Sequence, residues 1–222
     1  MPIPPQIIFD FLGQTRSIWV LSGLFGLLWI VWNMNIVGWS SGVDGQLPAF
    51  VFVAALVMAI LGLRFSVDIT QWPVVVLSAA VSGAYFGFLP WNFYPQKIMP
   101  GYSGKSLAGF FLGVLAILSG AKIATAILVL GVPTMDALIA ILRRLSRGQS
   151  PVWGDRGHLH HKFLDLGFSK RTISLFYLFS SLILGLIALS LNSQQKAYTI
   201  VMVFVVLAAF SVWFKLFFEK RK

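Results

Sequence analysis

All three histidines of the chain fall within four positions, in the segment Asp155-Arg156-Gly-His158-Leu-His160-His161. An arginine can make two parallel hydrogen bonds to a phosphate, and a neutral histidine can donate a hydrogen bond or carry a proton. The segment is therefore predicted to bind a phosphate or diphosphate group. Zinc coordination by the histidines and Asp155 is the alternative, which we favour less because ligands so close together on a helix do not converge.

A second candidate is the turn Gly42-Val-Asp44-Gly, which follows an apolar run. Glycine allows close backbone approach and positive φ, so this turn could hold a phosphate while Asp44 coordinates Mg²⁺ or contacts a sugar or base. The same pattern also fits a simple helix C-cap followed by a turn.

A third candidate, Gly104-Lys105-Ser106, looks like the end of a phosphate-binding loop of nucleoside triphosphatases. Met99 stands where that motif needs its first glycine, so this enzyme class is excluded. What remains is a glycine-containing loop before a helix that opens near Ser106, whose N-terminal amides would favour an anion.

Asp136 lies three residues after Pro133, within a long apolar run. A proline interrupts helical hydrogen bonding and exposes backbone carbonyls, which can line a polar cavity. Asp136 is predicted to lie in such a cavity or to pair with Arg143 or Arg144, and both can hold together.

The elements that carry these residues are predicted to be membrane helices. Of the 222 residues, 58% are hydrophobic and only 11% charged, with a mean hydropathy of +0.84; a bilayer span needs about 20 apolar residues. The chain contains no cysteine, which excludes disulfides and thiolate chemistry. We predict an all-α, polytopic membrane protein of about seven spans, with the fourth and fifth forming a tight hairpin, at about 17–37, 47–63, 72–90, 106–119, 121–142, 172–191 and 198–218.

The basic residues fall mostly on one side of these spans. Thirteen of the 17 lie on the side of the loops at about 38–46, 91–105 and 143–171 and of the C-terminus, while Arg16, Arg64, Lys122 and Lys196 lie on the other. Positively charged loops face the cytoplasm, so the candidate residues are predicted to face the cytoplasm and residues 1–15 the outside. This asymmetry explains the net charge of +10 and makes nucleic acid an unexpected partner.

Together these motifs resemble the polyprenyl-phosphate N-acetylhexosamine-1-phosphate transferases of glycosyltransferase family 4, and most nearly the WecA-like branch. The resemblance runs from about Trp29 to Ser190. It is most specific from Leu118 through Pro133-Thr-Met-Asp136-Ala, and from Ser150-Pro through Asp155-Arg156-Gly-His158-Leu-His160-His161 to Ser169.

Two other segments match the family less completely. Asn35, Asp44 and the glycines around Asp44 agree with its Asn/Asp-Gly loop. Residues 88–105 resemble a later loop, with Asn92, Gly101 and Gly104 in place, but Tyr102 stands where the family has a metal-binding aspartate. The family's upstream Asp-rich motif has no counterpart, so the sequence resembles roughly the C-terminal two thirds of a transferase.

The resemblance implies transfer of a sugar 1-phosphate, that of an N-acetylhexosamine, from a UDP-sugar to a polyprenyl phosphate in cell-envelope glycan synthesis. It implies a plasma-membrane location, Mg²⁺ as cofactor with Asp44 as ligand, and a homodimer or a partner chain supplying an N-terminal half. Catalytic roles would fall to Asp44, His158, His160 and His161, and substrate-binding roles to Asn35, Asn92, Gly101, Gly104, Asp136 and Arg156.

Residues 1–222 are predicted to form one membrane domain, with a lead-in at 1–15, a transferase-like region at 29–190, and a last span with a basic tail at 191–222. A catalytically inactive relative that binds the UDP-sugar or lipid phosphate stays open as an alternative, because of Tyr102 and Ser41. A transporter is disfavoured, since its polar groups would be spread through the depth of the bilayer.

Overall fold

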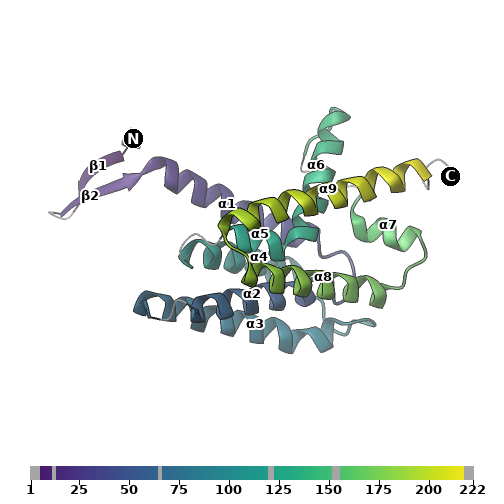
Figure 1. Ribbon diagram of the computed structural model, residues 1–222, viewed down its shortest axis with the longest axis horizontal. Coiled ribbons are helices and arrows are strands. Elements are labelled where there is room, and N and C mark those ends of the chain that lie inside the picture. The colour runs from purple at the N-terminus through teal and green to yellow at the C-terminus, as the bar shows by residue number, and fades with distance from the viewer. Residues whose placement is uncertain (1–5, 12–13, 65–66, 120–122, 152–155, 218–222) are drawn as a thin grey trace.

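The computed structural model describes residues 6–11, 14–64, 67–119, 123–151 and 156–217. Within them a β-hairpin leads into a bundle of helices (Figure 1). The elements are β1 Gln6–Phe11, β2 Gln14–Trp19, α1 Val20–Trp39, α2 Gln46–Leu63, the 3-10 helix η1 Ile69–Gln71, α3 Trp72–Asn92, α4 Gly101–Leu118, α5 Ile123–Val129, α6 Gly131–Ser146, α7 Leu159–Asp165, α8 Lys170–Ser190 and α9 Ser193–Phe217.

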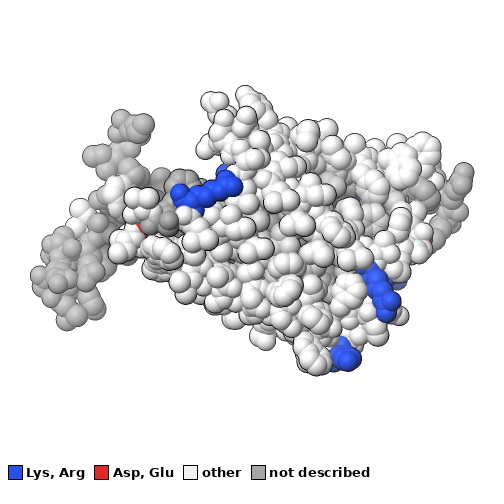
Figure 2. Space-filling model, turned by 60° about the horizontal axis from the view of Figure 1, so that its bottom comes forward, with Lys and Arg blue, Asp and Glu red and all other residues white. Residues whose placement is uncertain are grey.

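The helices have the length and composition of membrane spans. Among the described residues six are long and apolar enough to cross a bilayer, and α5 with α6 makes a seventh if the pair counts as one span. This confirms the prediction of an all-α, polytopic membrane protein. The face in Figure 2 is almost entirely uncharged, with basic side chains only toward its two ends, as expected where lipid surrounds the middle of the bundle.

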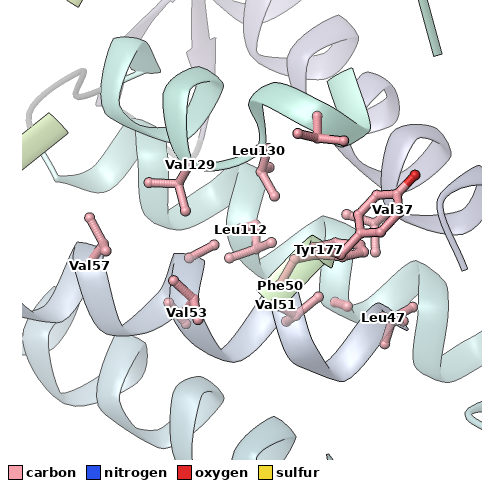
Figure 3. Close-up of a cluster of buried hydrophobic side chains, with 14 of the residues drawn as sticks. Val37, Leu47, Phe50, Val51, Val53, Val57, Leu112, Val129, Leu130 and Tyr177 are labelled. Atoms are coloured by element: carbon pink, nitrogen blue, oxygen red, sulfur yellow. The ribbon is translucent and has the colours of Figure 1, made fainter. Parts of the chain in front are cut away.

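Helix α2 lies at the centre of the bundle. Most of its side chains are buried, and it is apolar on every side because α3, α4, α5 and α8 surround it. Figure 3 shows Phe50 of α2 beside Tyr177 of α8, with Leu112 of α4 nearby. This central helix fixes where the turn before it, which contains Asp44, is presented.

Helices α1 and α4 approach each other closely because α4 has glycines at the contact. A Cβ on Gly109 would overlap the backbone of Asn33 and Met34. One turn further on, Trp29 Nε1 donates a 3.1 Å hydrogen bond to the carbonyl of Gly113. Small residues allow membrane helices to pack backbone against backbone, and here they hold the end of α1 beside α4.

The predicted fifth span at 121–142 is wrong as a single helix, since α5 and α6 meet at an angle of 83°. Pro133 has no N–H to donate to Val129, so the helical ladder breaks at this point. Leu130 stands in the break, donating to Ala126 and accepting from Thr134. As a result α6 points away from the bundle axis (Figure 1).

The structure adds detail to three other predicted regions. The predicted lead-in at 1–15 contains strand β1, which pairs antiparallel with β2, with Gln6 opposite Trp19. Helix α4 begins at Gly101, one turn earlier than the predicted opening near Ser106. Helices α4 and α5 are separate and in contact, while the connecting residues 120–122 lie outside the described residues.

The close contact between α1 and α4 generates a first prediction. Gly109→Ala should destabilise the protein by about 1–3 kcal/mol, since the added methyl meets backbone that cannot rotate away. Gly83→Ala is the matched control: Gly83 lies in helix α3 with no atom within 4 Å of an added Cβ, so the protein should be as stable or slightly more stable. Apparent Tm in detergent measures both, and equal Tm values would contradict the close packing of α1 on α4.

Candidate functional site

A chain of buried polar contacts joins α6 to the histidine segment, which we define as residues 156–162. His158 Nδ1 lies 2.9 Å from Asp136 Oδ2, and the Leu159 backbone N–H donates to Asp136 Oδ1 at 2.7 Å. Arg144 Nη2 lies 3.3 Å from His158 Nε2. Because a guanidinium can only donate, Nε2 must accept and Nδ1 must carry the proton. Both ring nitrogens of His158 are thus engaged.

Two arginines of α6 hold the backbone that precedes His158. Arg143 Nη1 donates to the Gly157 carbonyl at 2.8 Å, and Arg144 Nη1 donates to the Pro151 carbonyl at 2.6 Å. The predicted pairing of Asp136 with Arg143 or Arg144 is therefore wrong. The carboxylate instead accepts from the histidine segment, because α7 begins at Leu159 beside Asp136 and the Leu159 N–H is directed at the carboxylate.

His160 packs against the Asp44 turn. A Cβ added to Gly42 would overlap the His160 ring, so only glycine fits there. His160 is buried, its ring lies 4.3 Å from that of His161 by centroids, and within the described structure neither Nδ1 atom has a hydrogen-bond partner. Two segments 118 residues apart in the chain thus meet at one point.

Burial lowers the pKa of His160 to about 4, and repulsion from His161 adds to the effect. The pKa of His161 is also lowered, first by partial burial and then by the charge of Arg156. Both imidazoles are therefore neutral at pH 7, and each can accept a proton or a hydrogen bond.

The turn before α2 holds Asp44 at the edge of a pocket. Gly45 adopts φ +79°, which favours glycine, and its N–H donates to Asn92 Oδ1 at 3.0 Å. Asp44 Oδ1 lies 3.4 Å from Lys170 Nζ, and its Oδ2 accepts from the Gln96 N–H at 3.4 Å. Ser174 Oγ donates to the Asp44 carbonyl. Contacts from α3 and α8 therefore fix this turn.

The pocket beside this turn has a volume of about 230 Å³. We call it the Asp44 pocket; its polar lining consists of Ser41, Asp44, Asn92, Gln96, Tyr102 and Lys105, with Gly42 and Gly101 among the remaining residues. Gly42 also touches His160, so the pocket and the histidine segment adjoin. The arrangement offers carboxylate, amide, phenol and ammonium groups to a polar, anionic ligand.

Several predicted site residues do not line this pocket. Asn35 lies in α1 and its amide donates to Val31 of the same helix at 2.8 Å, because α1 continues to Trp39. Gly104 lines a separate apolar groove and accepts a hydrogen bond from Tyr85. His158 is engaged as described above, and Arg156 is exposed next to His161. Asp155 lies outside the described residues.

Other residues at the site were missed by the sequence analysis. Lys170 and Gln96 contact Asp44, and Arg144 contacts His158. Lys170 was counted only as a basic loop residue, and Arg144 was considered as a partner of Asp136 and not of His158. No local signal distinguishes them, since their roles come from contacts across the bundle.

The described residues do not fit a complete Mg²⁺ site. Asp44 provides the only carboxylate among the residues that line the pocket, and Lys170 lies beside it. Over the described ranges, no three histidine, aspartate or glutamate side chains gather as metal ligands, so neither Mg²⁺ nor the alternative zinc site gains support.

Known proteins that are similar to this chain belong to the family that its motifs resemble. A family model described as glycosyl transferase family 4 matches residues 5–120. The decaprenyl-phosphate N-acetylglucosaminephosphotransferase of Mycolicibacterium smegmatis is 33% identical over 192 residues, covering 74% of this chain and 46% of that protein. The probable undecaprenyl-phosphate N-acetylglucosaminyl 1-phosphate transferase of Bacillus subtilis is 28% identical over 187 residues, covering 82% and 51%.

A third relative is the phospho-N-acetylmuramoyl-pentapeptide-transferase of Moorella thermoacetica. It is 30% identical over 177 residues, which cover 76% of this chain and 52% of the relative. The chain spans about half the length of the curated relatives it matches.

The buried carboxylate generates a second prediction. Asp136→Asn should destabilise the protein by about 2–3 kcal/mol, because an amide presents a donor toward the His158 and Leu159 N–H groups. Asp165→Asn, at an exposed position of α7, should change stability by less than about 0.5 kcal/mol. Apparent Tm and protease sensitivity at residues 147–160 report the change. A wild-type profile for Asp136→Asn would show that Asp136 does not anchor the segment.

The neutral His160 generates a prediction for pH dependence. The unfolded chain takes up a proton near pH 6.5, whereas folded His160 does so only near pH 4. The contribution of His160 to the free energy of unfolding is therefore fully present above about pH 6.5 and decreases as the pH falls toward 4. In a thermal series from pH 7.5 to 5, His160→Gln should show a smaller decline in Tm than the wild type, and His161→Gln an intermediate one. Parallel declines in all three would refute the burial of His160.

Proposed function

Because the chain belongs to glycosyl transferase family 4, we propose that it acts in the transfer of a sugar 1-phosphate from a UDP-sugar to a polyprenyl phosphate. The names of two relatives combine decaprenyl phosphate or undecaprenyl phosphate with the transfer of N-acetylglucosamine phosphate. We extend to this chain an N-acetylhexosamine as the sugar, cell-envelope glycan synthesis as the process, and a site on the cytoplasmic side of the plasma membrane.

One observation carries this proposal: the contact of Gly42 with His160, which makes one site from two loops. The Asp44 pocket would receive the UDP-sugar, with Lys105 and Lys170 balancing diphosphate charge and Asn92 shaping the turn. His160 and His161 would contact the diphosphate or sugar from the far side of Gly42. Asp136 and His158 would position these imidazoles rather than touch substrate.

The chemistry needs more negative ligands than the pocket provides. Both reactants are anions, and a divalent metal would neutralise them and align the attacking oxygen when bound. Asp44 would be one ligand, so we propose that the remaining carboxylates come from outside the described residues. A homodimer and a partner chain that supplies an upstream half are the two sources proposed.

A second candidate is a relative that binds the UDP-sugar without turning it over. The observation that favours it is Tyr102, which lines the pocket where the resemblance places a metal-binding aspartate. A neutral phenol is a poor substitute for a carboxylate as a ligand of a divalent cation.

Binding of UDP-N-acetylglucosamine tests the shared site. We expect Asp44→Asn, His160→Ala and Gly42→Ala each to weaken binding to protein in detergent by roughly tenfold or more. The first two remove a group that would contact the ligand, and the methyl group added in Gly42→Ala displaces the His160 ring. Gly38→Ala is the control, since an added Cβ at Gly38 meets no atom within 4 Å. Wild-type affinity in the three site variants would show that the pocket is assigned incorrectly.

Release of UMP separates the two candidate functions. Membranes containing the protein, polyprenyl phosphate, UDP-N-acetylglucosamine and Mg²⁺ are assayed with and without the N-terminal half of the Bacillus subtilis relative. UMP release that requires Asp44 indicates a transferase. Binding without release in both settings indicates the non-catalytic relative.

A further inference from the structure

We propose that a second pocket, formed by α6, α7 and α9, binds the headgroup of an anionic glycerophospholipid. This pocket, which we call the basic pocket, has a volume of about 400 Å³. It shares no lining residue with the Asp44 pocket. The proposal does not depend on the proposed function, because it concerns a different set of residues and a different ligand.

The charge of the basic pocket points to an anion. Arg143 and Arg147 reach it from the last turns of α6, and Lys162 reaches it from α7. The described residues that line the pocket include no aspartate or glutamate. Lys162 is buried, with its Nζ 5.6 Å from the centre of the Phe214 ring. Basic side chains around one cavity can donate charge-assisted hydrogen bonds to a phosphate.

The walls of the basic pocket point to a lipid rather than a free ion. Leu142 and Val212 line it and are 64% and 58% exposed. Helix α9 is long and apolar enough to span a membrane, and only 6% of its segment Ser193–Phe214 is buried, which leaves most of its surface available to lipid. The basic pocket thus lies where the loop-side end of a span meets charged residues, which is the depth of a phospholipid headgroup.

The 83° bend explains how such a pocket forms. A continuous fifth span would carry its arginines straight into the aqueous loop. The bend instead directs α6 away from the bundle axis and packs it against α9 (Figure 1), so the arginines at its C-terminal end remain beside apolar surface. Basic side chains near a membrane surface attract anionic lipids at about 1 kcal/mol each.

The basic pocket is also connected to the histidine segment. Arg143, which lines it, donates to the Gly157 carbonyl at 2.8 Å, and the Lys162 backbone N–H donates to the His158 carbonyl at 3.2 Å. A headgroup held by Arg143 and Lys162 would therefore restrict the backbone on both sides of His158. Bound anionic lipid should accordingly stabilise the fold, and protect residues 156–162 in particular.

The experiment measures lipid binding to the full chain in an uncharged detergent. Phosphatidylglycerol retained by the protein is quantified by native mass spectrometry, with phosphatidylcholine as the uncharged reference. Arg147→Gln is the main variant, because Arg147 is exposed and its replacement leaves buried contacts intact. Lys97→Gln is the control, an exposed lysine in another loop with the same change in charge.

We expect phosphatidylglycerol to bind the wild type and Lys97→Gln equally, and Arg147→Gln roughly fivefold more weakly. Phosphatidylglycerol should also raise the apparent Tm of the wild type and slow hydrogen exchange at residues 156–162. Equal affinities in Arg147→Gln and Lys97→Gln would overturn the proposal, because attraction would then be diffuse. Displacement of phosphatidylglycerol by inorganic phosphate, or by stoichiometric polyprenyl phosphate, would overturn the choice of ligand.

Discussion

The buried carboxylate of Asp136 is the contact on which the arrangement of the loops depends. An ionised carboxylate is costly to bury unless hydrogen bonds replace its lost hydration. Here His158 and the Leu159 N–H supply them, and Arg144 completes the chain from the other side of the imidazole. Because Asp136 lies just past the break at Leu130, the bent span and the histidine segment form one structural unit.

Steric fit joins this unit to the rest of the site. His160 lies against Gly42 with no room for a Cβ, and Gly45 takes a left-handed conformation between contacts from Asn92 and the Ser174 hydroxyl. The two glycines therefore have different roles: one gives space to a neighbouring ring, and the other permits a backbone angle. The same arrangement places neutral imidazoles behind a pocket that contains a carboxylate and an ammonium group.

Membrane helices are predictable from composition because the bilayer demands long apolar segments and rejects unpaired backbone groups. This is why six spans and the broken seventh were located to within a few residues. The predictions of structure were wrong or incomplete where the bilayer constrains the chain less. Pro133 marked a kink, but the size of the bend was not predictable. The hairpin at 6–19 lies before the first span, where hydropathy has no information about strand pairing.

The sequence alone determined the membrane class, the side on which basic residues gather, and the loops that carry Asp44, Asn92 and the histidines, because these depend on residue types along one segment. Only the tertiary structure decided which side chains meet. It paired Asp136 with His158 instead of an arginine, left Asn35 hydrogen-bonded within its own helix, and brought His160 to Gly42. Such contacts depend on how helices pack across the bundle, and no local pattern specifies that packing.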